Sequence, residues 1–180
     1  MNKRGRPTAD ERIARDERIL DVATDLFLEH GFAGVALDRV AAEAGVTKRT
    51  LYTAFGDKPA ILRAVVRRQH PYADQPTADL VSTATAIGSA LLSDRAVALH
   101  RLVIAESTRS PELAREFHEA GPLAAQQALV RAGATPETAA ELFTLLLGEL
   151  HRERLLGLAP APTAAAVATR AARAVAVLST

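Results

Sequence analysis

Apolar residues recur along most of the chain at the three- and four-residue spacing of helices that face a core. Residues 35 to 58 read VALDRVAAEAGVTKRTLYTAFGDK, and a first short helix there has one apolar stripe formed by Leu37, Val40, Ala41 and Ala44. Gly45 follows, where a helix end accepts a left-handed residue, and Thr47 is suited to cap a second helix. That second helix turns Leu51 and Phe55 inward. The pattern predicts two short helices joined by a tight glycine turn.

The second helix begins with basic and hydroxyl side chains that are predicted to face outward. A short helix, a glycine turn and a second helix of this kind are typical of the helix-turn-helix motif, which reads the DNA major groove. We therefore take Lys48, Arg49 and Thr50 as candidates for reading base edges. Arg49 has the geometry to pair bidentately with O6 and N7 of guanine.

The same stretch resembles a known family at many fixed positions. These are Gly31-Phe32, Val40-Ala41, Ala44-Gly45-Val46-Thr47, Thr50-Leu51-Tyr52, Phe55 and Asp57-Lys58. Over residues 12 to 66 the chain is similar to the tetracycline-repressor-like (TetR) family, and beyond that it resembles the family only in length and helical character. The resemblance implies an all-α fold, with an N-terminal three-helix helix-turn-helix domain and a larger C-terminal helical domain for ligand binding and dimerisation.

The resemblance also implies contacts to DNA phosphates. Candidates are Thr47, Tyr52, Thr53 and Lys58. Tyr52 is either a core aromatic or a phosphate donor, and the family favours the second reading. Lys58 resembles the family's phosphate-contacting lysine at the start of helix 4, where Asp57 is placed to cap that helix.

The chain departs from the family pattern in three places. Val35 and Ala36 stand where a threonine or serine usually opens helix 2, and Ala54 stands where tyrosine or histidine is common. Both changes remove polar groups that touch phosphates, so we expect weaker backbone anchoring. Arg49 stands where the family often has a small residue.

The first nine residues, MNKRGRPTA, are polar and lack any periodicity. Arg4-Gly5-Arg6-Pro7 matches the core of the AT-hook pattern, whose arginines suit a narrow minor groove. Lys3, Arg4 and Arg6 are therefore candidates for a DNA-binding arm. The alternative is a solvated tail without a partner.

The remaining pattern predicts helices throughout. Helix 1 is expected over about 10 to 30, and helix 4 is expected to end near His70-Pro71, where HPYADQP reads as a boundary. We predict an arm at 1–9, a helix-turn-helix domain at 10–56, a connecting helix with its boundary at 57–75, and a helical effector-binding and dimerisation domain at 76–180. In the resembling family helix 4 connects the ligand domain to the DNA domain.

After residue 76 no alternation argues for a strand. Helix starts are marked by Ser93-Asp94, Ser110-Pro111 and Thr135-Pro136, and Gly121-Pro122 is expected to break or kink a helix. The helix from 136 is expected to be a long one that reaches Leu156-Gly157, and the last helix covers about 163 to 178.

These last two helices are rich in leucine, alanine and valine and carry little polar surface. We predict a homodimer held by stretches 136–157 and 163–178, with Ala171 and Ala174 at the partner. The alternative is that both helices merely close the core of the monomer.

Composition narrows the classes of function. The chain has no cysteine, so disulfides, thiolate nucleophiles and cysteine-ligated metals are excluded. A net charge of +1 conceals a basic front, since residues 1–70 hold 13 Lys and Arg against 10 Asp and Glu. No long apolar run suggests a membrane span or secretory signal, so we expect a cytoplasmic protein.

These observations together predict a dimeric regulator of transcription, most often a repressor in the family, released from a palindromic double-stranded operator by a small molecule. Weak candidates for lining the effector pocket are His100, Arg101, Glu106, Phe117 and Phe143. The second reading is an all-helical enzyme with a DNA-binding head, whose acid-base pair would be His100 with Glu106, or His151 with Glu149 or Glu153. The sequence contains no catalytic motif, cofactor motif or metal site that supports this reading. The third reading is a nucleoid-type structural protein that binds DNA of any sequence. The near-neutral net charge argues against it, because such binding depends on many contacts to phosphates.

Overall fold

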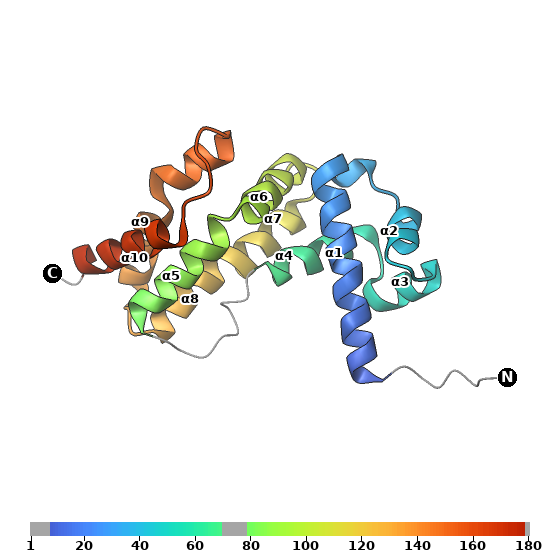
Figure 1. Cartoon of the computed structure of the whole chain (residues 1–180), viewed down its shortest axis with the longest axis horizontal. Coiled ribbons are helices and arrows are strands. Elements are labelled where there is room, and N and C mark those ends of the chain that lie inside the picture. Colours follow the sequence, from blue (N-terminus) through green and yellow to red (C-terminus); the bar gives the residue numbers. More distant parts are fainter. Residues whose placement is uncertain (1–7, 70–78, 179–180) are drawn as a thin grey trace. The chain divides into compact units, whose positions relative to one another are not determined.

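The computed structural model describes residues 8–69 and 79–178, and every regular element in these two ranges is a helix (Figure 1). The all-α class predicted above is thereby confirmed. The arm residues Lys3, Arg4 and Arg6 and the boundary HPYADQP lie outside the described residues. The chain divides into two compact units, Met1–Val65 and Val66–Thr180.

The first unit is built on the long helix α1 (Ala9–Gly34). Thr8 and Glu11 form a capping box, in which the Thr8 hydroxyl accepts from the Glu11 amide and the Glu11 carboxylate accepts from the Thr8 amide. Gly31 has a φ of 70°, so the regular helix is interrupted directly after His30, as predicted. The face turned to the core is formed by Ile19, Leu20, Ala23, Leu26 and Phe27.

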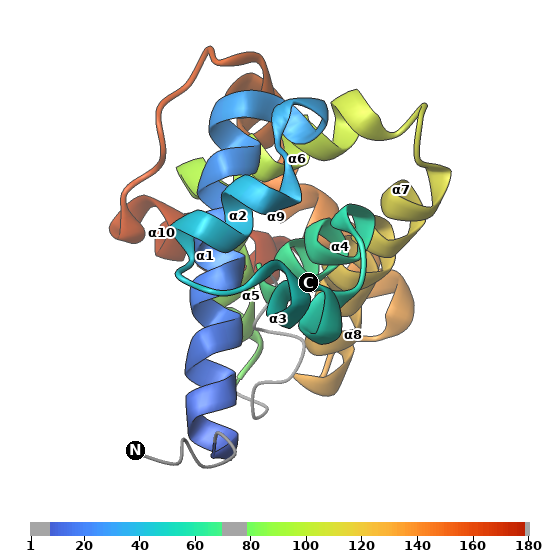
Figure 2. The ribbon, with the colours of Figure 1, turned by 90° about the vertical axis from the view of Figure 1, so that its right-hand side faces the viewer.

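Helices α2 (Leu37–Glu43) and α3 (Lys48–Phe55) are short and are joined by the predicted glycine turn. Gly45 has a φ of 65°, and the Val46 amide donates to the Ala41 carbonyl at 2.9 Å. The Thr47 hydroxyl accepts from the Thr50 amide at 3.1 Å, a cap worth about 1 kcal/mol. Helix α2 packs against both α1 and α3, which completes the helix-turn-helix arrangement (Figure 2). Helix α4 (Lys58–Arg68) then begins with Asp57 accepting from the Ala60 amide.

The second unit contains helices that surround one apolar core. Buried residues of α5, α8, α9 and α10 make up this core, and α6 packs against α5, α7 and α9. The helices are α5 (Leu80–Leu91), α6 (Asp94–Glu106), α7 (Pro111–His118), the π-helical turn η2 (Glu119–Leu123), α8 (Ala124–Arg131), α9 (Pro136–Leu156) and α10 (Ala164–Leu178).

Two expectations about this unit need correction or refinement. The break or kink expected at Gly121 and Pro122 takes the form of a π-helical turn, which carries the chain from α7 into α8. Helix α9 is not continuous, since Gly148 takes φ 45° and ψ −142° in its interior. The long helix expected from 136 to 157 therefore consists of two helical segments that meet at Gly148.

Helices α5 and α10 approach each other closely through Gly88. A Cβ atom added at Gly88 would lie 2.9 Å from Cγ1 of Val167 and 3.3 Å from Cδ1 of Leu146. Glycine is therefore the residue that lets the two helices pack at this distance.

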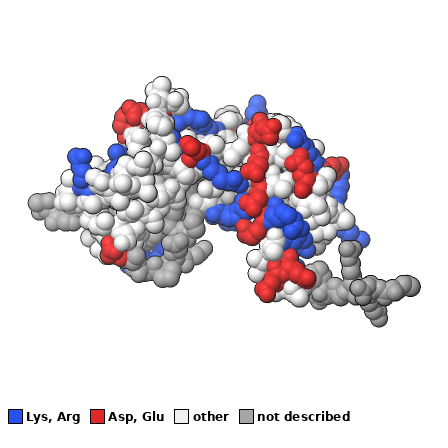
Figure 3. Space-filling view, in the orientation of Figure 1, with Lys and Arg blue, Asp and Glu red and all other residues white. Residues whose placement is uncertain are grey.

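The sequence of α10 is divided between a narrow buried stripe and a wide exposed face. Val167, Ala171 and Ala174 are buried, and the two alanines belong to the same core as α5. Because Ala171 is fully buried in this core, the prediction that it faces a partner was wrong, whereas Ala174 also lines a groove on the outer side of α10. Half of the other residues of α10 are exposed alanines, and few charged side chains cover α5 and α10 in Figure 3.

Candidate nucleic-acid interface

Helix α3 has one buried anchor and an exposed side that begins at its N-terminus. Leu51 is fully buried, whereas Lys48, Arg49, Tyr52 and Thr53 are exposed. Because the helix is only two turns long, a single buried position fixes which face is outward. The exposed face is the one predicted to meet DNA.

The three base-reading candidates lie in different environments. The Lys48 ammonium contacts Oδ1 of Asp38 on α2 at 2.8 Å, and this carboxylate raises the pKa of Lys48. The Thr50 hydroxyl lies 2.8 Å from the Thr47 hydroxyl and is only partly exposed. The Arg49 side chain has no hydrogen bond or ion pair to any residue that the structure describes. Its guanidinium is therefore free to meet a base.

Two of the hydroxyl candidates, Thr47 and Thr53, already have local partners. Thr47 caps α3, and the Thr53 hydroxyl donates to the Arg49 carbonyl at 2.8 Å. Tyr52 is 46% exposed, so it is not the core aromatic of the alternative reading. A phosphate contact by each of these residues stays a prediction.

Lys58 holds the connection between α1 and α2. Its ammonium donates to the carbonyls of Phe32 at 2.8 Å and Val35 at 2.9 Å, with that of Ala33 at 3.4 Å. It also lies 4.6 Å from the centre of the Phe32 ring. An ammonium has three protons, so a phosphate would have to compete with these carbonyls. The phosphate contact of Lys58 stays a prediction.

The start of α2 shows the consequence of the departures from the family pattern. Ala36 occupies the capping position without a side-chain bond, and Val35 is buried at 2% exposure. The Val35 carbonyl accepts from Lys58, so the segment is anchored by a lysine instead of a hydroxyl cap.

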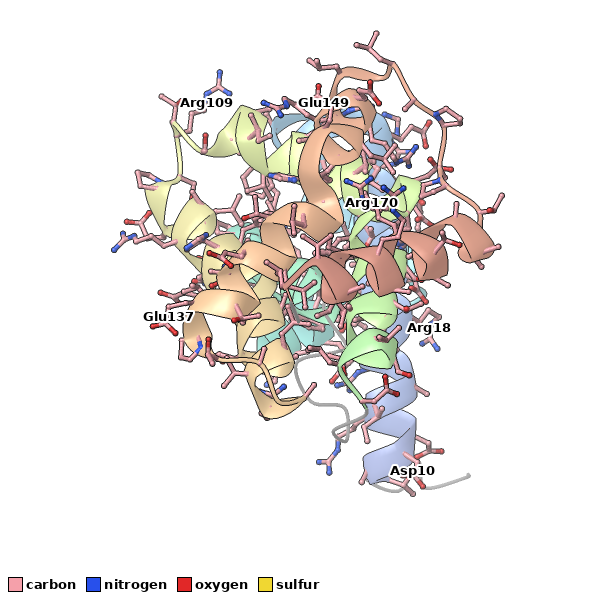
Figure 4. All side chains as sticks on the ribbon, turned by 90° about the vertical axis from the view of Figure 1, so that its left-hand side faces the viewer. Asp10, Arg18, Arg109, Glu137, Glu149 and Arg170 are labelled. Atoms are coloured by element: carbon pink, nitrogen blue, oxygen red, sulfur yellow. The ribbon has the colours of Figure 1, made fainter. Side chains whose placement is uncertain are left out.

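Arg18 of α1 and Asp38 of α2 form bonds within the helix-turn-helix unit that the sequence did not predict, Asp38 with Lys48 and Arg18 with the end of α2. Arg18 Nε donates to the Ala44 carbonyl at 3.0 Å, which ties the end of α2 to α1. Figure 4 labels Arg18 on α1. No local signal in the sequence marks a bond between Arg18 and a residue 26 positions away.

The effector candidates do not form one group. His100 and Phe117 lie together, with ring centres 4.7 Å apart, and His151 of α9 stacks on His100 with its Nε2 3.4 Å from Nδ1. Burial, with a smaller contribution from Arg154, lowers the pKa of His151. Arg101 instead donates to the carbonyls of Arg154 and Leu155 at the end of α9.

The other two effector candidates are placed elsewhere in the second unit. Glu106 is 9% exposed and lies 3.7 Å from Arg109, and Phe143 packs against the core. Neither of the two hollows described in this unit is lined by any of the five candidates. One is a groove of about 540 Å³ lined by Leu145, Ala165, Ala166, Thr169, Arg170, Arg173, Ala174 and Val177. The other lies on α8, with Leu123, Gln126, Gln127, Val130, Arg131 and Pro136.

Two further features concern membranes and metals. None of the described helices combines the length and apolar character that crossing a bilayer requires. Within residues 8–69 and 79–178, no three His, Asp or Glu side chains gather as metal ligands would.

Comparison with known proteins accounts for both units. Residues 19–65 match the family of bacterial regulatory proteins named tetR, and residues 78–179 match the C-terminal domain of AefR-like transcriptional repressors. Over 76 residues the chain is 40% identical to the HTH-type transcriptional regulator SrpR of Pseudomonas putida. This match covers 42% of this chain and 36% of SrpR. The chain thus matches well under two thirds of that relative.

Solved structures extend the similarity over nearly the whole chain. A TetR regulator of Agrobacterium tumefaciens is 25% identical with a TM-score of 0.71, covering 91% of this chain and 92% of that one. The flavonoid-responsive regulator FrrA is 28% identical with a TM-score of 0.65, covering 92% and 95%. Since one family model matches residues 19–65 of the first unit and another spans more than half of the chain, this protein belongs to the TetR family of transcriptional regulators.

Proposed function

We propose that the protein is a homodimeric repressor that binds a palindromic operator and is released from it by a small molecule. The observation that carries the proposal is the outward N-terminal turn of α3, which presents an unpartnered Arg49 beside Lys48. The match of the second unit to a repressor C-terminal domain supports the sign of regulation.

Base reading is assigned first to Arg49, followed by Lys48 and Thr50. Arg49 can reach a guanine without giving up any bond to a described residue, whereas Lys48 must leave Asp38. Thr47, Tyr52, Thr53 and Lys58 are proposed as phosphate contacts that set the register of α3. Lys3, Arg4 and Arg6 are proposed as an arm for the minor groove.

Dimerisation is proposed through the groove between α9 and α10. Leu145 is 42% exposed and Val177 is 66% exposed there, with Ala165 and Ala166 between them. An exposed apolar face of this size on two neighbouring helices is suited to a second copy, which would form a four-helix interface. Two copies would then place two α3 helices on the two half-sites of an operator.

A small-molecule effector is proposed for the second unit, within the predicted domain 76–180. FrrA, a relative of known structure, is flavonoid-responsive by name, which supports a response to small organic molecules in this chain. His100 and Phe117 remain the best placed of the predicted effector residues, because their rings already lie together with His151.

The dimer can be tested with two matched substitutions on α10. Ala166 lies in the groove, whereas Ala168 is exposed but does not line it. We expect Ala166→Glu to give a monomer by light scattering and to weaken operator binding, because a carboxylate would be buried at the interface. Ala168→Glu should retain the wild-type mass. A dimeric Ala166→Glu variant with full operator affinity would refute this interface.

The DNA-binding part is tested by mapping the DNA that the protein protects upstream of its own gene. A protected near-palindrome, bound far more tightly than random DNA, is expected. Binding without such preference would support the nucleoid-type alternative instead.

A further inference from the structure

Helix α9 is broken in its middle at a position where only glycine is comfortable. Gly148 has a φ of 45° and lies between Leu147 and Glu149, with helical residues on both sides. A side chain here would be strained by the backbone, and its Cβ would lie 2.8 Å from Nη2 of Arg170. The break is therefore built into the sequence by a residue that permits it.

A second residue stabilises the break. Interrupting a helix leaves the carbonyls of the preceding turn without amide partners. The Arg170 guanidinium of α10 takes their place: Nε donates to the Leu146 carbonyl, and Nη2 donates to those of Leu145 and Leu147 at 3.1 and 3.2 Å. Figure 4 shows Arg170 beside the middle of α9, between the labelled Glu137 and Glu149.

The two halves of α9 have different neighbours. The first half contributes Ala139, Leu142, Leu146 and Leu147 to the core shared with α5, α8 and α10. The second half turns to α6, where His151 stacks on His100 and Arg154 pairs with Asp94 at 2.6 Å. A straight helix would continue in the direction of its first half. The break therefore allows α9 to pack in the core with its first half and against α6 with its second half.

Arg170 also lines the groove between α9 and α10, together with Leu145 from the turn that it caps. We infer that Arg170 is a positioning residue that holds α9 broken at Gly148 and so gives this groove the shape that receives a second copy of the chain. The inference rests on the proposed homodimer. It assigns to Arg170 an internal role, whereas Arg173, the other arginine of the groove, contacts no carbonyl or carboxylate among the described residues.

The guanidinium is suited to this task and an ammonium is not. Arginine presents several donors in a fixed plane, which can serve three neighbouring carbonyls at once. Lysine would keep the charge but not the fork, so Arg170→Lys separates geometry from charge. Arg173→Met is the matched control, because it removes a similar side chain from the same groove.

The experiment measures the dimer dissociation constant by sedimentation at temperatures where every variant is folded, and amide exchange in the second half of α9. We expect Arg170→Met and Arg170→Lys to weaken dimerisation roughly tenfold or more and to speed exchange over residues 149–152, with Arg173→Met close to wild type in exchange. If Arg170→Met does not fold, Arg170→Lys carries the test.

The outcomes separate the inference from the proposal on which it rests. A wild-type protein that is monomeric at all concentrations refutes the proposed homodimer, and with it the role of Arg170 in shaping its groove. A wild-type dimer whose Arg170 variants dimerise normally, or whose exchange over residues 149–152 is unchanged, overturns the inference alone.

Discussion

Arg49 differs from Lys48, the other basic residue of α3, in having no side-chain partner among the described residues. Because it can reach a base edge, we expect Arg49→Ala to lower the preference for operator over random DNA, by roughly 1–3 kcal/mol per half-site. Titration of both duplexes at several salt concentrations measures this. Thr53→Ala, which removes a hydroxyl bonded within the helix, is the control. An unchanged preference in Arg49→Ala would assign base reading to Lys48 or Thr50.

Lys58 makes a different prediction, because its ammonium already serves the carbonyls between α1 and α2. We expect Lys58→Ala to weaken binding to operator and random DNA alike, and to lower the free energy of unfolding by roughly 1–3 kcal/mol. Salt titration and chemical denaturation measure the two effects.

The salt slope decides whether Lys58 also reaches a phosphate. A slope shallower by about one unit per site would show that Lys58 exchanges a carbonyl for a phosphate on DNA. An unchanged slope with reduced stability would contradict the phosphate contact and leave only the positioning of α2.

His151 makes stability depend on pH. Its half-buried imidazole has a pKa below the ordinary value of 6.5, so the unfolded chain binds the proton more tightly than the folded one. The stability that the neutral ring contributes is present above pH 6.5 and is lost as pH falls through the lower pKa of the folded state. We expect the difference in unfolding free energy between wild type and His151→Gln to become smaller as the pH is lowered from 7. Parallel curves would refute this, and His30→Gln on exposed α1 is the control.

At the scale of elements, the sequence predicted where helices begin and end, because these points depend on residues close by in the chain. Thr47, Ser93 and Thr135 each cap the helix that they were expected to open, and Gly157 ends α9 in a left-handed conformation. Such caps depend on neighbours within four residues, so spacing alone reveals them.

The features that sequence spacing missed depend on distant partners. The carbonyls at the Gly148 break are bonded by an arginine 22 positions later, and Ala171 is buried by residues of other helices whereas Ala166 is exposed. A run of leucines around a single glycine predicts an ordinary helix, because its periodicity contains no information about a guanidinium on another helix.

In the candidate nucleic-acid interface, too, local features were predictable from the sequence and bonds to distant residues were not. The outward face of α3 was predictable from the inward spacing of Leu51 and Phe55, since a short helix has one buried side; Leu51 is fully buried and Phe55 is partly buried. The bonds of Lys48 to Asp38, Arg18 to Ala44 and Lys58 to the α1–α2 connection were not. These bonds decide which basic residue is free, so the structure ranks Arg49 above Lys48.

At the scale of the whole molecule, the two units are expected to communicate through binding energy. If an effector loosens operator binding by some factor, saturating operator DNA must weaken effector binding by the same factor. Calorimetric titration of an effector with and without bound operator measures this coupling. An effector affinity that is unaffected by DNA would refute release by effector.

The close approach of α5 and α10 at Gly88 has a consequence for how the sequence can drift. Alanine at residue 88 would favour helix formation, yet its methyl group would meet Val167 at 2.9 Å. A substitution that shortens Val167 would create the room that this methyl group requires. The two positions should therefore change together among functional descendants of this chain: in a library randomised at both, alanine at 88 should survive selection mainly where 167 has become alanine or glycine.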